Sequence, residues 1–136
     1  MSLKQILILV LSLFYSSWSL ANDRETLKHA AQEQGLFFFY SSSCPYCQRF
    51  APVLKEFSEH YGFKVLAISV DRGYLPSFPD AELDEGQKNQ FQVTVLPSLF
   101  LINPYKEQAA LVTEGALEEE ELSRRILKII HLQVQR

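Results

Sequence analysis

Two cysteines, Cys44 and Cys47, are the residues of this sequence whose type and spacing most directly suggest chemistry. They are separated by two residues within the segment FFFYSSSCPYCQRF (37–50), and the sequence contains no other cysteine. Such a pair can form half of a zinc site, close a small structural disulfide, or act as a redox pair that opens and closes. These three kinds of site imply different functions.

A structural zinc site is not expected, because it needs four ligands and the cysteines supply only two. The three histidines are scattered through the sequence without the paired spacing of zinc ligands: His29, His60 and His131. A purely structural disulfide is not expected either. A bridge across two residues closes a very small loop, removes little entropy from the unfolded chain and therefore stabilises a fold only weakly.

A redox pair explains where the cysteines lie. The apolar run 36–40 is typical of a strand buried on both faces, and Cys44 follows it where a helical pattern begins. The unpaired N–H groups and the dipole of a helix N-terminus favour the thiolate of Cys44, which is the nucleophile of disulfide exchange. Pro45 suits the first helical turn, where its missing N–H costs nothing. We therefore expect Cys44 to attack and Cys47 to resolve the mixed disulfide.

The rest of the sequence predicts an α/β domain in which helices and strands alternate. From the hydrophobic spacing and the positions of Gly and Pro, helices are expected at 24–34, 45–61, 84–93 and 118–132, and strands at 36–40, 63–70, 98–102 and 109–114. The segment 72–83 contains two prolines and is expected to be an exposed loop. This order predicts a central sheet flanked by helices.

Residues 1–21 have the three-part layout of a secretory signal peptide. Lys4 precedes an apolar run from 6 to 15, and the segment ends in the residues SLA (19–21). The run is short for a bilayer, which needs about 20 apolar residues, so we expect cleavage after Ala21 and no stable membrane insertion. Residues 22–136 would then form one domain in an oxidising compartment such as the periplasm, where a disulfide can persist.

The composition argues against other classes of protein. The formal net charge is −3, and no stripe rich in Lys or Arg appears, so a nucleic-acid partner is not expected. The sequence shows no internal repeat, low-complexity tract or shift in composition that would indicate a second domain.

With these elements in place, the sequence resembles the thioredoxin superfamily over residues 24–132. Besides CPYC, the resemblance depends on VLPSLFLI (95–102) and on Gly115 at the end of the last strand. In that superfamily a cis-proline opens the third core strand and faces the cysteines, and the matching residue here is Pro97. The resemblance implies a thioredoxin-like fold and a substrate-binding surface formed by Pro97, Leu96, Pro45 and Tyr46.

Longer segments resemble the TrbB/TraF group of thiol–disulfide proteins of F-type conjugative transfer systems. They are FFFYSSSCPYCQRFAPVLKEF (37–57), YGFKVLAISVD (61–71), LPSFPD (75–80) and LPSLFLINP (96–104). The resemblance implies a periplasmic disulfide isomerase of conjugative pilus or type IV secretion assembly, as TrbB is described. Its clients would be cysteine-containing exported proteins of the transfer apparatus, its redox partner another dithiol protein, and its cofactor nothing beyond the Cys44–Cys47 pair.

Two positions depart from cytosolic thioredoxins, which have an acidic residue in the strand before the motif and a lysine on the neighbouring strand. The matching residues here are Phe38 and Ala67, both apolar, so the acid that helps to deprotonate the second cysteine is missing. Slow resolution of mixed disulfides is then expected, which suits disulfide shuffling more than fast reduction. Dimeric periplasmic isomerases also carry a dimerisation domain, and since no segment here could form one, we expect a monomer.

Two other functions remain open at this point. The protein could be a periplasmic thiol reductant of another pathway, which would need a low reduction potential and a membrane electron donor. It could also be a non-enzymatic assembly subunit that keeps the fold without using the thiols. The presence of both cysteines in a good nucleophile position argues against the second.

Overall fold

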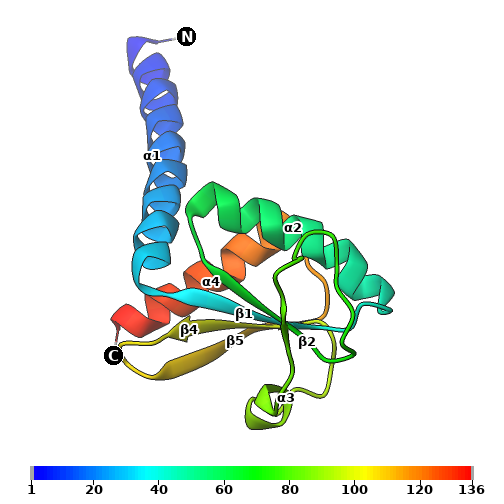
Figure 1. The fold of residues 1–136 in the computed structure, drawn as a ribbon. Helices are drawn as coiled ribbons and strands as arrows, with labels where there is room; N and C mark the ends of the chain where they lie inside the picture. Colours follow the sequence, from blue (N-terminus) through cyan, green and yellow to red (C-terminus); the bar gives the residue numbers. More distant parts are fainter. Residues whose placement is uncertain (1, 136) are drawn as a thin grey trace.

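The computed structural model describes the backbone of residues 2–135, and the side chains of these residues except 14–20. Along this part of the chain the elements follow in the order α1 (Leu3–Glu33), β1 (Gly35–Tyr40), α2 (Pro45–Tyr61), β2 (Val65–Ser69), β3 (Glu82–Leu83), α3 (Gln87–Gln90), β4 (Ser98–Asn103), β5 (Gln108–Glu114) and α4 (Glu119–Val134). The helices α2 and α4 lie over one face of the sheet and the short α3 lies on the opposite side (Figure 1).

The sheet is mixed, and β1 is its central strand. Its strand order is β3-β2-β1-β4-β5. The strands β1, β2 and β3 run parallel to one another, while β4 is antiparallel to both β1 and β5. The structure therefore confirms the predicted α/β class, a central mixed sheet flanked by helices.

Side chains of β1 alternate between two apolar layers, as the pleat of a strand requires. Leu36, Phe38 and Tyr40 belong to the main core, which they share with residues of α1, α2 and α4. Phe37 and Phe39 face the other side, where they pack with residues such as Phe91. The uninterrupted apolar run was predicted to be a strand buried on both faces, and the structure has it so.

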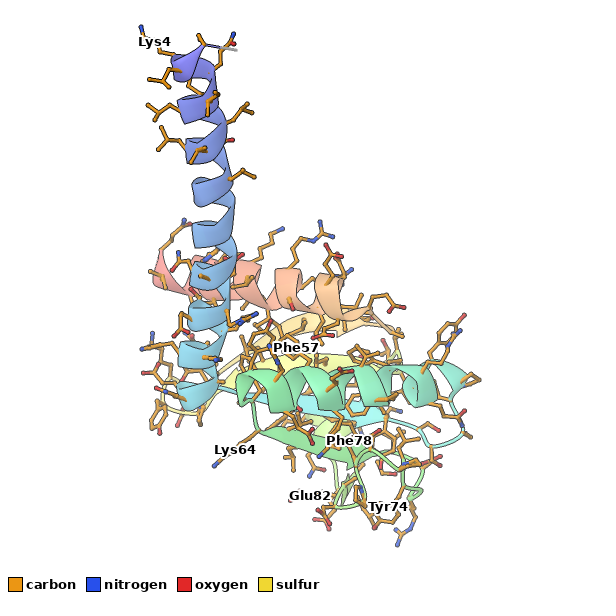
Figure 2. The ribbon with its side chains drawn as sticks, turned by 90° about the horizontal axis from the view of Figure 1, so that it is seen from above. Lys4, Phe57, Lys64, Tyr74, Phe78 and Glu82 are labelled. Carbon is orange, nitrogen blue, oxygen red and sulfur yellow. The ribbon has the colours of Figure 1, made fainter. Side chains whose placement is uncertain are left out.

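The first helix is much longer than predicted, since it begins at Leu3 rather than near residue 24. No Gly or Pro stands between its start and Gly35, so nothing in this stretch interrupts helical hydrogen bonding. Among the described side chains of α1, those of Leu27 and Ala30, near its C-terminal end, are buried in the core. The N-terminal part projects from the domain, with Lys4 at its far end (Figure 2).

The apolar side chains near the start of α1 are exposed, and that of Leu3 has 85% of its surface accessible. In the part of the chain that the structure describes, no helix is both long enough and apolar enough to span a membrane. Of the cleavage signal expected at 19–21, the side chains of Ser19 and Leu20 lie outside the described residues.

Two short elements between β2 and β4 also differ from the prediction. The expected loop 72–83 ends in the strand β3, which pairs with β2 over two residues and is too short to show a periodicity. The helix expected over 84–93 is reduced to the four residues of α3. Asp84 Oδ1 accepts hydrogen bonds from the backbone of Gly86 and Lys88, and Gln92 has a φ of 55°, so the chain turns instead of continuing the helix. The bounds of the other strands and helices lie within two residues of the prediction.

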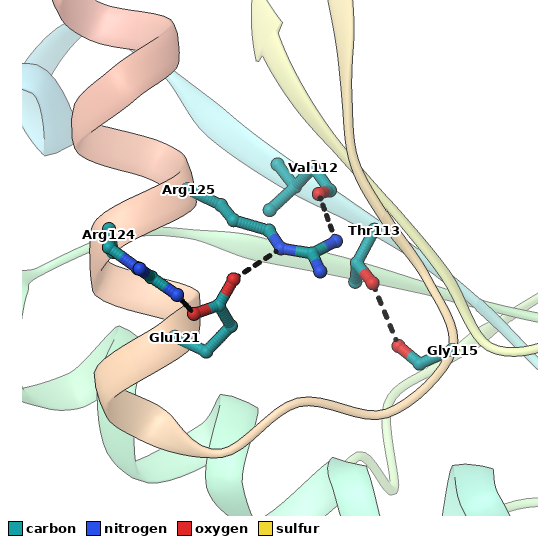
Figure 3. Close-up of polar contacts among 6 residues, drawn as sticks. All are labelled: Val112, Thr113, Gly115, Glu121, Arg124 and Arg125. Atoms are coloured by element: carbon teal, nitrogen blue, oxygen red, sulfur yellow. Dashed lines mark hydrogen bonds and ion pairs between the residues drawn. The ribbon is translucent and has the colours of Figure 1, made fainter.

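Helix α4 is hydrogen-bonded to β5 near its start and to the residue before β1 near its end. Near its start, Arg125 Nε donates to Glu121 at 2.9 Å and its Nη1 reaches the Val112 carbonyl of β5 at 3.4 Å (Figure 3). Arg124 forms an ion pair with the same Glu121. Near its end, the amides of Gln133 and Gln34 exchange two hydrogen bonds, of 3.0 and 3.1 Å, and Gln34 is the residue between α1 and β1. Helix α4 thus closes the main core over β1.

Replacing Phe38 by Ala should lower the free energy of unfolding by about 3–5 kcal/mol, because it removes a fully buried ring from the main core. Urea denaturation measures the change. Tyr105→Ala provides the control, since Tyr105 is 81% exposed and surface substitutions of this kind usually stay within about 0.5 kcal/mol. A Phe38→Ala protein as stable as the control would contradict the assigned core.

Candidate active site

Cys44 lies at the point where the chain leaves β1 and enters α2. It is the N-cap residue of α2, and its Sγ accepts a hydrogen bond from the backbone N–H of Cys47 at 3.3 Å. Pro45 occupies the first helical turn, as predicted. The sulfur of Cys44 thus meets an N–H group that has no partner within the helix, in the field of the positive end of the helix dipole.

The two cysteines differ in accessibility. Both are free thiols in this structure; Cys44 is partly exposed, whereas Cys47 has 0% of its surface accessible. Burial raises the pKa of the Cys47 thiol to about 12, and its hydrogen bond with Cys44 acts in the same direction. At neutral pH Cys47 is therefore a protonated thiol, and the Cys44 sulfur is the more accessible of the two.

The segment before β4 lies beside Cys44. The Leu96–Pro97 peptide bond is cis, and the Sγ of Cys44 donates to the Leu96 carbonyl at 3.9 Å. Gly115, just after β5, donates its N–H to the Pro97 carbonyl at 2.7 Å, and its φ of 113° suits a residue without a Cβ. The structure thus brings together Cys44, Cys47, Leu96 and Pro97, which come from two distant parts of the sequence.

The other two expected site residues flank the first cysteine on the surface. Pro45 is exposed, and Tyr46 has 59% of its surface accessible. The Cζ of Arg49 lies 4.7 Å from the centre of the Tyr46 ring, a cation–π contact along the first turn of α2. The Tyr46 side chain is therefore largely exposed to solvent, two residues after Cys44.

The floor of the site is apolar. Phe38 of β1 and Ala67 of β2 are buried and lie opposite each other in the strand register. The ring of Phe38 packs 5.3 Å from that of Tyr40 and 5.8 Å from that of Phe50. Cytosolic thioredoxins have an acid and a lysine at these two positions. In this protein neither Phe38 nor Ala67 offers a group that could take a proton from Cys47.

One group near the cysteines was not singled out from the sequence. Asp71, two residues after β2, accepts hydrogen bonds from Ser41 and Ser42 of the loop that leads to Cys44. The carboxyl ends of neighbouring parallel strands meet at one edge of a sheet, and both this loop and Asp71 follow such ends. That placement, together with three consecutive serines before Cys44, was the feature of the sequence that could have predicted a contact between Asp71 and this loop.

In the part of the chain that the structure describes, no three side chains among His, Cys, Asp and Glu come together.

The sheet order, the cysteine pair at the start of α2 and the cis-proline beside it define a thioredoxin-fold protein with a dithiol site. Among solved structures, a protein assigned as the thiol:disulfide interchange protein DsbE of Chlorobium tepidum is similar with a TM-score of 0.60. It is 20% identical in sequence, and the match covers 76% of this chain and 84% of that one. At this identity the similarity establishes the fold.

The sequence model of a family described as "TraF: F plasmid transfer operon protein" matches residues 12–127, and the chain belongs to this family. Protein TraF of Escherichia coli (strain K12) is 28% identical over 109 residues, which cover 80% of this chain and 44% of TraF. Protein TrbB of the same organism is 30% identical over 98 residues, 69% of this chain and 54% of TrbB. The chain thus spans about half the length of these curated relatives, and the resemblance to the TrbB/TraF group is confirmed.

In a Cys44→Ser variant, Cys47 should remain a thiol throughout the neutral pH range, because burial of its sulfur opposes ionisation. The ultraviolet absorbance of the thiolate, followed against pH, measures this. The same protein unfolded in urea is the control and should titrate near the ordinary value of about 8.5. A folded protein that titrates there as well would show that Cys47 is not held in an apolar environment.

Proposed function

We propose that this protein catalyses thiol–disulfide exchange on exported proteins, with Cys44 as nucleophile and Cys47 as resolving thiol. The observation that carries the proposal is the difference between the two sulfurs. The accessible one lies at the N-terminus of α2 and accepts an N–H, while the other is buried directly behind it. A thiolate is the attacking species in disulfide exchange, and a helix N-terminus favours it.

The reaction needs no cofactor beyond the cysteine pair. The Cys44 thiolate attacks one sulfur of a client disulfide, forms a mixed disulfide, and releases the other client sulfur as a thiolate that takes up a proton. Cys47 then loses its proton and attacks the Cys44 sulfur. This forms the Cys44–Cys47 disulfide and releases the reduced client. The reverse sequence oxidises a client, and the second dithiol protein that we propose as redox partner resets the pair.

Isomerisation is the outcome that the apolar floor favours. Resolution requires the Cys47 proton to leave, but burial raises the pKa of this thiol to about 12 and Phe38 and Ala67 offer no base. The mixed disulfide therefore persists for longer. During that time a second cysteine of the client can attack the client sulfur that is bonded to Cys44. This attack forms a new disulfide within the client and releases the Cys44 thiolate.

The surface around Cys44 suits an extended client chain. The backbone of Leu96 lies beside the sulfur, and the preceding Val95 is 43% exposed. Tyr46 presents an exposed ring on the other side of the nucleophile, next to the exposed Pro45. We propose that a client pairs with the Leu96–Pro97 backbone and rests its side chains against these apolar groups.

Membership of the TraF family supports a role in conjugative transfer, such as assembly of the pilus or of a type IV secretion apparatus. The clients would then be cysteine-containing envelope components. We propose that residues 1–21 act as a signal peptide, supported by the exposed apolar side chains at the start of α1. The domain 22–136 would work in the periplasm as a monomer, without membrane insertion after cleavage and without nucleic acid.

Replacing Cys47 by Ser should trap clients, because Cys44 can still attack while the escape from the mixed disulfide is blocked. In cells with the complete transfer machinery, heavier bands should appear on non-reducing gels and collapse on reduction. Cys44→Ser is the matched control and should trap nothing. If Cys47→Ser also traps nothing, the non-enzymatic assembly subunit becomes the better description.

The second candidate function is that of a periplasmic thiol reductant. The raised pKa of Cys47 favours it, since a sulfur that is not stabilised as a thiolate makes the disulfide harder to reduce. It requires a membrane electron donor and a low reduction potential.

The reduction potential separates the two functions. Because the Cys44 sulfur lies at a helix N-terminus and accepts an N–H, the reduced form should be stabilised and the potential should lie above about −270 mV, the value of thioredoxin. Equilibration with glutathione redox buffers measures it. A potential at or below that of thioredoxin would favour the reductant.

A further inference from the structure

The carboxylate of Asp71 joins two loops at the edge of the site. Its Oδ2 accepts hydrogen bonds from Ser41 Oγ at 2.9 Å, from the Ser42 backbone N–H at 2.9 Å and from Ser42 Oγ at 2.7 Å. Its Oδ1 accepts from the Gly73 N–H at 3.1 Å and from Ser69 Oγ at 3.2 Å. The loop before Cys44 and the connection after β2 are therefore tied through one side chain.

Close packing of the two loops is independent evidence for this connection. A Cβ added at Gly73 would lie 2.0 Å from the Ser42 Oγ and 2.7 Å from the Ser42 Cβ, so the Gly73 backbone packs directly against the Ser42 side chain. The Gly73 carbonyl accepts from Tyr40 Oη at 3.1 Å and from Ser69 Oγ at 2.7 Å, so the single Ser69 hydroxyl proton is shared between this carbonyl and Asp71 Oδ1. On the other side, Gln48 of α2 donates to the Ser42 carbonyl at 2.9 Å. The loop before Cys44 is thus held from two directions.

The hydrogen bonds favour the ionised form of Asp71. Desolvation acts against ionisation, but hydrogen bonds from Ser42, Gly73 and Ser41 outweigh it and hold the pKa of this carboxyl well below its usual range. The side chain is nevertheless exposed. At every pH at which thiols exchange, Asp71 is therefore an anion that accepts hydrogen bonds and donates none.

A short chain of contacts leads from Asp71 to the nucleophile. Asp71 holds the side chain of Ser41, the Ser41 carbonyl accepts the Cys44 N–H at 3.2 Å, and the Cys44 Sγ accepts the Cys47 N–H. We propose that Asp71 is a positioning residue of the redox pair: it fixes the loop 41–43 against the connection 71–73 and so keeps the Cys44 sulfur at the N-terminus of α2. The inference builds on the thiol chemistry proposed above, but its test does not need a client.

Three substitutions separate position from charge. Asp71→Asn removes the charge and replaces one acceptor oxygen by an NH2 group, which cannot accept the hydrogen bonds of the donors that face it. Gly73→Ala keeps all charges but forces the loops apart at Ser42. Asp80→Asn is the matched control, because it removes one negative charge from an exposed position between β2 and β3, outside residues 71–73.

The measurement is the rate at which iodoacetamide alkylates Cys44 in a Cys47→Ser background, from pH 5 to pH 9. Asp71→Asn and Gly73→Ala should both slow alkylation near pH 6, by about fivefold, the factor that corresponds to one lost hydrogen bond of about 1 kcal/mol. Asp80→Asn should leave the rate unchanged. If Asp71→Asn fails to fold, Ser42→Ala, which removes only the 2.7 Å bond to Asp71, should give a smaller change of the same sign.

Two results would overturn the proposal. One is an unchanged rate in both Asp71→Asn and Gly73→Ala. The other is faster alkylation in Asp71→Asn with no change in Gly73→Ala, which would mean that the carboxylate acts only through its charge. Alkylation requires neither a client nor a redox partner, so a failure of the client trap and a failure of this proposal are distinguishable.

Unfolding at low pH gives a second readout. Because the pKa of Asp71 is lowered in the folded state, its contribution to stability is present above its ordinary value of 3.8 and is lost as the pH falls further. The difference in unfolding free energy between wild type and Asp71→Asn should therefore be constant above about pH 5 and shrink below about pH 4. Tyr40 and Cys47, whose pKa values are raised mainly by burial and also by the charge of Asp71, do not titrate in that range. A difference that stays constant down to pH 2 would contradict the ionised, hydrogen-bonded carboxylate.

Discussion

Strand β1 packs large apolar side chains into two layers at once, Phe38 and Tyr40 against the helices and Phe37 and Phe39 against the other side of the sheet. A strand of this kind is stable only at the centre of a sheet, with a neighbour on each edge and cover on each face. Its carboxyl end is therefore fixed in space by the whole core, and the chain leaves it through a loop of only four residues, 41–44, before α2 begins. Cys44 is thus positioned by the strand that is packed on both of its faces.

From that position, the chemical difference between the cysteines follows from their depth and from the N-terminus of α2. Cys44 is the last residue before the helix and reaches solvent, whereas Cys47 is one turn inside and faces the same layer as Phe38. One thiol is supplied with an N–H group and a favourable dipole, and the other is deprived of water. Two thiols three residues apart in the sequence thus lie in different environments, one partly exposed at the start of α2 and one buried. The apolar residues beneath them keep that difference large, since they contribute no compensating charge.

The sequence was sufficient for the features that repeat or that carry their own chemistry. The strands, α2 and α4 show clear periodicity, and the CPYC motif and the Leu96–Pro97 pair identified residues that the fold brings together. It was insufficient where a single long-range contact decides the outcome. Strand β3 exists because it pairs with β2. Helix α3 is short for a local reason that the hydrophobic pattern does not show, since Asp84 Oδ1 accepts the Lys88 N–H and Gln92 turns the chain. The hydrogen bond that Ser41 donates to Asp71 spans 30 residues, and no local pattern predicts which carboxylate will meet which hydroxyl.

The fastening of α4 by the exchanged amides of Gln34 and Gln133 has a consequence for how the molecule is made. These residues lie 99 positions apart, and the antiparallel partner of β1, strand β4, also comes from the last third of the chain. The main core cannot close until α4 is available, because this helix supplies part of one layer of the core. A chain threaded end-first through an export channel would stay extended during transit, with both thiols accessible to solvent. Cys47 would become buried only after α4 had emerged.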